Sequence, residues 1–258
     1  MLWLINGDDL MKVISYGGGI QSTALILLSI DGVLEKPDAV IFSDTGSEMK
    51  STYDTVNSLE QLCKDHDINF VRVQMGVLHE DYIELNILPR IGNSSCTMNY
   101  KIRPIRKWLR KNQDESGIKP YSQLWLGITI DEERRARESD VQWVENRFPL
   151  LELNMTRDDC SNYIKEKYPN LNVSKSGCFH CPYSPKNHWV ILRRDHPDLF
   201  SIALDMEKAA NEGIYRLRLG LFKGKSIDIF NYSHQLSDFG FELDPVDFDC
   251  SSSGGCFL

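Results

Sequence analysis

A glycine-rich segment near the start of the chain has the composition of a phosphate-binding loop. Residues 15–22 read Ser-Tyr-Gly-Gly-Gly-Ile-Gln-Ser and lie between a short apolar run and the apolar residues 23–30. A strand, a glycine turn and a helix in this order direct backbone N–H groups and a helix N-terminus at an anion. Ser15 and Ser22 add hydroxyl donors without negative charge. Glycine turns also occur without a ligand, so the interpretation depends on what accompanies this segment.

Cysteines are the second group of residues that could do chemistry. Cys178-x-x-Cys181 has the spacing with which two thiolates hold one metal ion or cluster, and a proline follows it directly. An odd number of cysteines in a chain of this size favours metal or redox chemistry over a disulfide framework. Cys63 and Cys160 fall in helical patterns and are expected to be packed. The seven cysteines are Cys63, Cys96, Cys160, Cys178, Cys181, Cys250 and Cys256.

Alternating apolar runs and helical patterns predict the scaffold that must position these residues. Strands that alternate with helices over short links indicate an α/β fold with a doubly wound, mostly parallel sheet. In such sheets ligands bind beyond the carboxyl ends of the strands. We expect strands within residues 12–16, 39–42, 69–73, 124–128 and 149–153, and helices at about 20–31, 51–66, 104–111, 156–168 and 186–211.

Polar residues follow two other predicted strands and should lie at the same edge of the sheet as the glycine turn. Asp44 and Thr45 come directly after the run at 39–42, and a charged cluster with Arg134 and Arg135 follows the run at 124–128. Several ligand-competent loops at adjacent strand ends are more informative than one alone. The sequence therefore predicts a binding site at this edge.

Composition restricts the partners. The chain has 258 residues and a net charge of −8, so a basic patch for nucleic acid must be local. Residues 101–111 hold six basic residues and no acidic one, which suits either a solvated helix face or an anion-binding face. No run approaches a membrane span and no signal peptide is recognisable, so we expect a cytoplasmic protein without membrane contact.

The chain changes character in its second half. We expect an α/β domain over residues 1–153 and a helical region over 154–258 that carries the cysteine pair and packs on that domain. The last residues form a Ser/Gly-rich arm that includes Cys250 and Cys256. The sequence does not determine the oligomeric state, and a homodimer is one option.

Taken together, the motifs resemble the PP-loop ATPase, or adenine nucleotide α-hydrolase, superfamily. The closer resemblance is to its phosphoadenylylsulfate (PAPS) reductase-like branch, and it spans roughly residues 12–185. It implies a Rossmann-like, HUP-type sheet that binds ATP or an adenylylsulfate-type nucleotide. Besides the glycine segment and the strand ends, the matching segments are Cys96-Thr97, Lys101-Ile102-Arg103-Pro104, Pro149-Leu150, Thr156-Arg157-Asp158 and Gly177-Cys178 with Cys181-Pro182.

The resemblance also implies roles for individual residues. The catalytic set would be Ser15, Ser22, Asp44 and Cys256. The commoner loop of the superfamily has an aspartate where this chain has Gln21, so Asp44 becomes the better carboxylate for Mg²⁺. The nucleotide would be bound by Ser15, Gly17, Gly18, Gly19, Gln21, Ser22, Asp44, Thr45, Gly127, Arg134 and Arg135.

For the cysteines the resemblance leaves three options. Cys96, Cys178, Cys181 and Cys256 could hold a [4Fe–4S] cluster, the same four could bind zinc, or the thiols could be free. Cys250 is an alternative fourth ligand. Cys256 could instead act as a nucleophile, but a cluster ligand is not a free thiolate, so one residue cannot play both roles at once.

Three functions follow from the resemblance. The first is a PP-loop ATP pyrophosphatase that adenylates a substrate and supports sulfur transfer, with a sulfur donor protein and with tRNA or DNA held by residues 101–111. The second is an adenylylsulfate or phosphoadenylylsulfate reductase in which Cys256 attacks sulfur. The third, favoured by Gln21, is a nucleotide-binding partner subunit without catalysis.

Overall fold

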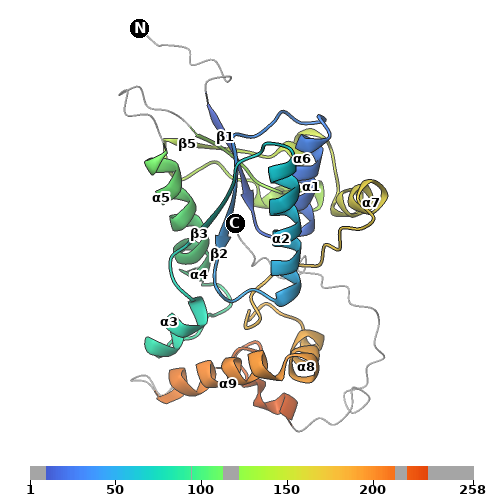
Figure 1. Cartoon of the computed structure of the whole chain (residues 1–258). Helices are drawn as coiled ribbons and strands as arrows, with labels where there is room; N and C mark the ends of the chain where they lie inside the picture. Colours follow the sequence, from blue (N-terminus) through green and yellow to red (C-terminus); the bar gives the residue numbers. More distant parts are fainter. Residues whose placement is uncertain (1–9, 94, 113–121, 213–219, 232–258) are drawn as a thin grey trace.

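Five parallel strands form the sheet at the centre of the described chain (Figure 1). The computed structural model describes residues 10–93, 95–112, 122–212 and 220–231. The strand order is β3-β2-β1-β4-β5, and the chain winds outward from β1 in both directions, as the predicted doubly wound fold requires. The strands are β1 (Met11–Tyr16), β2 (Ala39–Asp44), β3 (Phe70–Gln74), β4 (Ser122–Trp125) and β5 (Val144–Arg147).

Side chains along the two central strands alternate between two buried faces. Val13 of β1 and Ile41 of β2 belong to the core on one face, while Ile14 and Phe42 belong to the core on the other. All four are buried. Strands covered on both sides have apolar residues in consecutive positions, which is why the short apolar runs of the sequence predicted them correctly.

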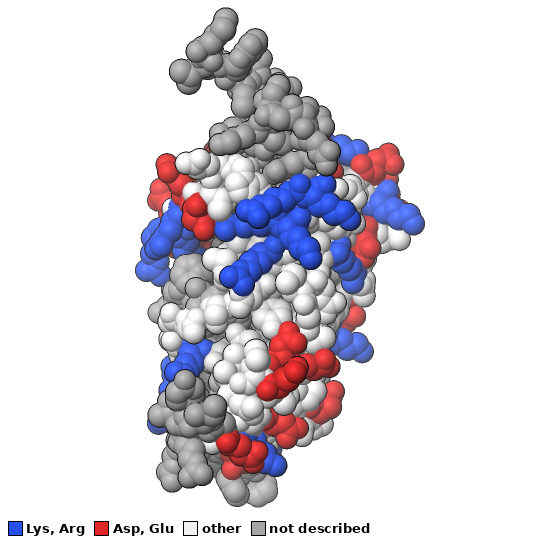
Figure 2. Space-filling model, turned by 90° about the vertical axis from the view of Figure 1, so that its left-hand side faces the viewer, with Lys and Arg blue, Asp and Glu red and all other residues white. Residues whose placement is uncertain are grey.

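One face of the sheet is covered by α5 (Arg103–Lys111). Ile105 and Leu109 of this helix pack in one cluster with Val13 of β1 and Val144 of β5. Its other side faces solvent. Figure 2 views this side of the molecule and shows a band of Lys and Arg side chains across the upper half, with Asp and Glu side chains grouped below it.

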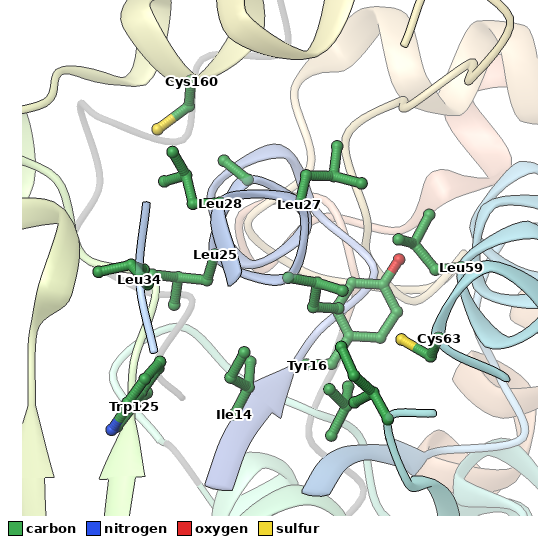
Figure 3. Packing of buried hydrophobic residues seen from close by; sticks show 14 of the residues in the cluster. Ile14, Tyr16, Leu25, Leu27, Leu28, Leu34, Leu59, Cys63, Trp125 and Cys160 are labelled. Atoms are coloured by element: carbon green, nitrogen blue, oxygen red, sulfur yellow. The ribbon is translucent and has the colours of Figure 1, made fainter. Parts of the chain in front are cut away.

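The opposite face is covered by α1 (Ile20–Ile30), α2 (Lys50–Asp65) and α7 (Arg157–Lys167). Figure 3 shows the leucines of α1 lying between the strands and Cys160 of α7. Cys63 of α2 belongs to the same cluster, and neither cysteine exposes any surface. The prediction that these two cysteines are packed is confirmed.

A third buried cluster joins α3, α8 and α9 beyond one end of the sheet (Figure 1). Within it the carboxylate of Glu207 on α9 accepts hydrogen bonds from the backbone N–H groups of Leu221 (2.7 Å) and Ile227 (3.0 Å). The remaining helical segments are α3 (Leu78–Glu84), α4 (Ser95–Thr97), a π-helical segment (Met98–Ile102), α6 (Pro149–Glu152), α8 (Lys186–Asp195), α9 (Pro197–Glu212) and 3₁₀ helices at Ile130–Arg135 and Ile227–Asn231.

Two predicted elements differ from the structure. The run at 149–153, expected to be a strand, forms the short helix α6, because Pro149 suits the first turn of a helix and a five-residue apolar run has no diagnostic period. The single helix expected at 186–211 is two helices separated at His196, and Pro197 begins the second. The division of the chain at residue 153 stays a prediction.

The helix expected at 156–168 is confirmed as α7. Thr156 and Asp159 form the reciprocal capping box that their spacing suggests, with each side chain accepting from the other's backbone N–H. In the part of the chain that the structure describes, no helix is both long and apolar enough to cross a membrane.

Candidate functional site

A cavity of about 440 Å³ lies beyond the carboxyl ends of β1 and β4, where the strand order reverses. This is the position at which doubly wound sheets bind ligands. Segments far apart in the sequence line it, including Thr45, Leu78 and residues within 89–93, and four groups contribute most of the wall. They are the glycine segment, the residues after β4 together with Arg157, the helical run from Cys96 to Lys101, and residues 175–183.

The glycine segment turns sharply into α1. Gly18 has a φ of +74°, and a β-carbon there would lie 2.7 Å from a methyl carbon of Thr52, so both backbone and space require glycine. The Ser22 hydroxyl donates to the Gly19 carbonyl (3.2 Å) and accepts from the Gly17 N–H (3.3 Å), which closes the loop. No side chain caps the N-terminus of α1, and its first turn has no acidic residue. Its N–H groups are therefore suited to an anion.

Five basic residues line the cavity against one acidic residue, in a chain whose net charge is −8. The acidic residue, Glu132, forms an ion pair with Arg135 at 2.6 Å. Arg157 begins α7, and its backbone N–H donates to Asp131 (2.7 Å), which fixes the start of that helix at the cavity. This excess of positive charge favours a polyanionic ligand. The basic residues are Arg90, Lys101, Arg135, Arg157 and Lys175.

Many residues predicted for the site meet at this cavity, and others do not. Ser15 is buried in β1, and Arg134 is exposed beside the cavity rather than in its wall. Gly18 belongs to the glycine loop but packs against Thr52 and does not line the cavity. Cys250 and Cys256 lie outside the described residues. The predicted residues that line the cavity are Gly17, Gly19, Gln21, Ser22, Thr45, Cys96, Gly127, Arg135, Cys178 and Cys181.

Asp44 supports its own loop and does not line the cavity. Its Oδ1 accepts hydrogen bonds from the Gly46 N–H (2.7 Å) and from the Tyr53 hydroxyl (2.8 Å). Burial and this carboxylate raise the pKa of Tyr53, so the tyrosine stays protonated as the donor. Because Asp44 lies outside the cavity wall, this arrangement does not bring it to a nucleotide, and a Mg²⁺ role for it stays a prediction.

Three of the basic cavity residues, Arg90, Arg157 and Lys175, were not assigned a role from the sequence. Arg157 lies within one of the matching motifs, after the run at 149–153 that was predicted as a strand and is a helix, and Lys175 comes shortly before the cysteine pair. Ser176 next to Lys175 lies close to the glycine turn, because a β-carbon on Gly19 would come 3.0 Å from its hydroxyl oxygen. The cavity wall is therefore formed by the loops that follow the strands together with two later segments, the start of α7 and the loop that contains Lys175.

Cys178 is fixed beside a buried carboxylate. An antiparallel bridge pairs Glu48 with Cys178, and the thiol lies 3.7 Å from the Glu48 Oε1 and 3.5 Å from the Thr45 hydroxyl. Burial and the charge of Glu48 raise the pKa of Cys178, and Lys101, 3.4 Å from Glu48 Oε1, acts in the opposite direction. The other oxygen, Glu48 Oε2, is buried with no hydrogen-bond partner among the described residues.

The described cysteines have the right chemistry for a metal centre, but their positions do not form one. Cys96, Cys178 and Cys181 all line one cavity, and thiolates suit zinc and iron–sulfur clusters. Among the residues that the structure describes, however, no three Cys, His, Asp or Glu side chains gather into a group that could hold a metal ion. The cluster and zinc therefore stay predictions, and no step proposed below passes through either.

Helix α4 and the π-helical segment are held at the cavity by β2 and α3. The Ser43 hydroxyl at the end of β2 donates to the Tyr100 carbonyl (2.7 Å), and the Tyr100 hydroxyl donates to Asp81 of α3 (2.6 Å). Short π-helical segments are frequent at functional sites. These contacts fix Lys101 of the cavity wall in place.

Known proteins and solved structures were compared with the chain. A comparison with curated proteins finds no match to this chain. Among solved structures, a PAPS reductase from Candida auris in complex with phosphate is 13% identical, with a TM-score of 0.44 over 67% of this chain and 82% of that one. The U34-tRNA thiolase NcsA from Methanococcus maripaludis, solved with its [4Fe-4S] cluster, is 16% identical, with a TM-score of 0.47 over 81% and 76%. At these values neither structure informs the activity.

A match to a protein-family model shows which family the chain belongs to. The model of the phosphoadenosine phosphosulfate reductase domain matches residues 11–182, which is more than half of the chain and includes the glycine segment, Cys96 and the cysteine pair. The predicted family is thereby confirmed: the chain belongs to the phosphoadenosine phosphosulfate reductase domain family, in the PP-loop superfamily.

Proposed function

We propose that this protein is an enzyme that uses ATP to adenylate a substrate and then introduces sulfur at the activated atom. One observation carries the proposal: a glycine loop, five cations and three cysteine thiols line the same cavity. Cations and loop amides suit the phosphates of a nucleotide, and thiols suit sulfur chemistry. Their shared cavity supports a reaction that joins the two.

The first step would form the adenylate. A carbonyl oxygen of the substrate attacks the α-phosphorus of ATP, and the bond from that phosphorus to the bridging oxygen breaks, so that pyrophosphate leaves. The N–H groups at the start of α1, with Lys175 and Arg157, would stabilise the charge that develops on pyrophosphate. Glu132 holds Arg135 by an ion pair at the edge of the same cavity.

The second step would exchange oxygen for sulfur. A hydrosulfide ion, supplied by a sulfur donor, attacks the activated carbon; AMP leaves with the former carbonyl oxygen, and loss of one proton gives the thiocarbonyl. No electrons are gained or lost. Cys96 and Cys181 line the cavity, and their S–H groups would donate weak hydrogen bonds to the incoming hydrosulfide without forming a bond to its sulfur.

The test measures pyrophosphate and AMP released from ATP with Mg²⁺, a sulfide source and candidate acceptors. Lys175→Gln should weaken ATP binding about tenfold or more, since a charge-assisted hydrogen bond contributes roughly 1.5–3 kcal/mol. Lys167→Gln is the matched control, because Lys167 is exposed at the far end of α7. Absence of ATP binding, or equal loss in both variants, would refute the proposal.

Reduction of adenylylsulfate or PAPS to sulfite is the second candidate. It is favoured by the family match and by the thiols beside the cations. In that reaction a thiolate attacks the sulfur of the sulfate, AMP or its 3′-phosphate leaves, and a second thiol releases sulfite. Sulfite from adenylylsulfate and a dithiol, without pyrophosphate from ATP, would establish it. Nucleotide binding without either product would support a non-catalytic subunit, as Gln21 in the loop suggests.

A further inference from the structure

One helical run connects the cavity to the surface. Residues 95–111 are helical throughout, from α4 through the π-helical segment to α5. Cys96, Thr97 and Lys101 at its start line the cavity. At about 1.5 Å per residue, the end of the run lies about 15 Å from Lys101 along the helix axis. A ligand bound along α5 would therefore approach the cavity at its N-terminal end.

The outer side of α5 presents a stripe of positive charge. Arg103, Lys107 and Lys111 are exposed and follow one another at four-residue spacing, which places them on one side of the helix about 6 Å apart. We name these three residues the α5 stripe. The other two cations of α5 have partners within the protein. Arg106 forms an ion pair with Asp140, and the guanidinium of Arg110 lies 4.9 Å from the centre of the Trp143 ring. No ion pair joins a stripe residue to another described residue.

The α5 stripe is unfavourable for the helix itself. Like charges four residues apart destabilise a helix by about 0.2–0.5 kcal/mol per pair, and surfaces that serve only solubility mix the two signs. The opposite side of α5 is fixed, since Ile105 and Leu109 are buried against the sheet. A rigid row of cations that have no ion-pair partner among the described residues can contact successive phosphates of a nucleic-acid backbone.

We propose that the α5 stripe binds the backbone of a folded RNA and delivers an unpaired base to the cavity. This inference rests on the proposed function, because it names the acceptor of that reaction. A concave cavity of about 440 Å³ admits a base only when the base is out of its stack. Loops of folded RNA already present unpaired bases, whereas duplex DNA must first be opened, which costs a few kcal/mol.

The test uses the full chain, fluorescence anisotropy and two probes: an RNA hairpin with an unpaired loop, and a DNA duplex of similar length. A triple variant, Arg103→Gln with Lys107→Gln and Lys111→Gln, removes the stripe. The control variant removes three charges elsewhere, by Lys36→Gln, Lys64→Gln and Lys208→Gln, all at exposed positions. Thermal unfolding confirms that both variants are folded.

We expect the stripe variant to lose about tenfold or more in RNA affinity and to lower the slope of log K against log salt by about 2–3, while the control changes less than about twofold. The hairpin should bind about tenfold or more tightly than duplex DNA. Equal effects of the two variants, no binding of the hairpin, or equal binding of duplex DNA would overturn the proposal.

A further measurement separates this proposal from the proposed function. ATP affinity is measured in the same variants and should be unchanged in both, because the stripe lies outside the cavity. Loss of RNA binding with normal ATP binding is the expected result. RNA binding through the stripe without any pyrophosphate release would refute the adenylation chemistry and leave the RNA surface intact.

Discussion

Gly127 lies against the backbone of Ser22, so closely that a β-carbon on Gly127 would come 2.8 Å from the Ser22 nitrogen. The residues after β4 thus pack directly on the start of α1. The obstacle is backbone rather than a flexible side chain, so it cannot move aside without shifting the glycine loop. This contact explains why a glycine follows β4, and it joins two walls of the cavity.

Gly127→Ala should therefore distort the loop. We expect a loss of about 1–3 kcal/mol in the free energy of unfolding, as for other overpacked sites, and weaker ATP binding. Gly177→Ala is the matched control: Gly177 also lines the cavity, but a β-carbon there meets nothing within 4 Å. Urea unfolding and calorimetric titration measure both effects. Equal behaviour of the two variants would show that the contact has no role.

The cysteines should divide into two classes by reactivity. Burial raises the pKa of Cys63 and of Cys160 to about 12, so both stay protonated and shielded in the native protein. In metal-free protein at about pH 8, iodoacetamide should label Cys96 and Cys181, and ATP should slow that labelling because both line the cavity. Peptide mass mapping measures each site. Rapid native labelling of Cys63, or labelling of Cys96 unaffected by ATP, would contradict the prediction.

The capping box of α7 should help to hold Arg157 at the cavity. Thr156→Ala removes the side chain that accepts from the Asp159 N–H, at a cost of about 1 kcal/mol. Since Arg157 begins this helix, ATP should bind more weakly as well. A double-mutant cycle with Asp159→Ala tests the cause, because the two residues act as one unit. Strictly additive losses in that cycle would exclude the capping box as the source.

Glu207 should make stability depend on pH. Its burial raises the pKa above the ordinary value of 4.5, so the folded state holds this proton more tightly than the unfolded state does. The contribution to stability is then full below pH 4.5 and is lost as the pH rises through the raised pKa. Urea unfolding of the wild type and of Glu207→Gln should be compared over this range. The free energy of unfolding should fall with rising pH by this contribution in the wild type but not in the variant. A difference that rises with pH would contradict the assignment.

The loss of the side chain is a separate prediction. Glu207→Ala leaves the N–H groups of Leu221 and Ile227 without their acceptor, which should cost at least about 2 kcal/mol in unfolding free energy. Asn211→Ala, at an intermediate position on the same helix, is the control. A loss of the same size in the control would assign the effect to the helix rather than to the carboxylate.

The sequence predicts the central scaffold well for a physical reason. Buried parallel strands such as β1 and β2 have apolar runs at their centres, Val13-Ile14 and Ala39–Phe42, and three consecutive glycines mark the turn between β1 and α1. β5 was not predicted, because Val-Glu-Asn-Arg at the edge of a sheet has only one buried residue. Conversely, the apolar run at 149–153 formed a helix, since short apolar runs do not define a period.

The sequence predicted those residues of the site that directly follow strands, but not the others. Gly17, Thr45 and Gly127 follow the ends of β1, β2 and β4, so their meeting follows from parallel topology. Lys175 and Arg157 come from the second half of the chain, and only tertiary packing brings them to the cavity. The same limit applies to Asp44, whose loop position is as predicted but whose carboxylate is taken by Tyr53 and Gly46.

The bridge between Glu48 and Cys178 joins an early part of the chain to a segment that is synthesised much later. The two residues are 130 positions apart, so β1 and β2 can pair on a nascent chain long before Cys178 has been made. Contacts of such long range form late in folding. On the ribosome, the sheet would hold the glycine loop before residues 175–183, which form the facing wall of the cavity, have been made. The cavity is therefore completed only after this second segment has folded against the first.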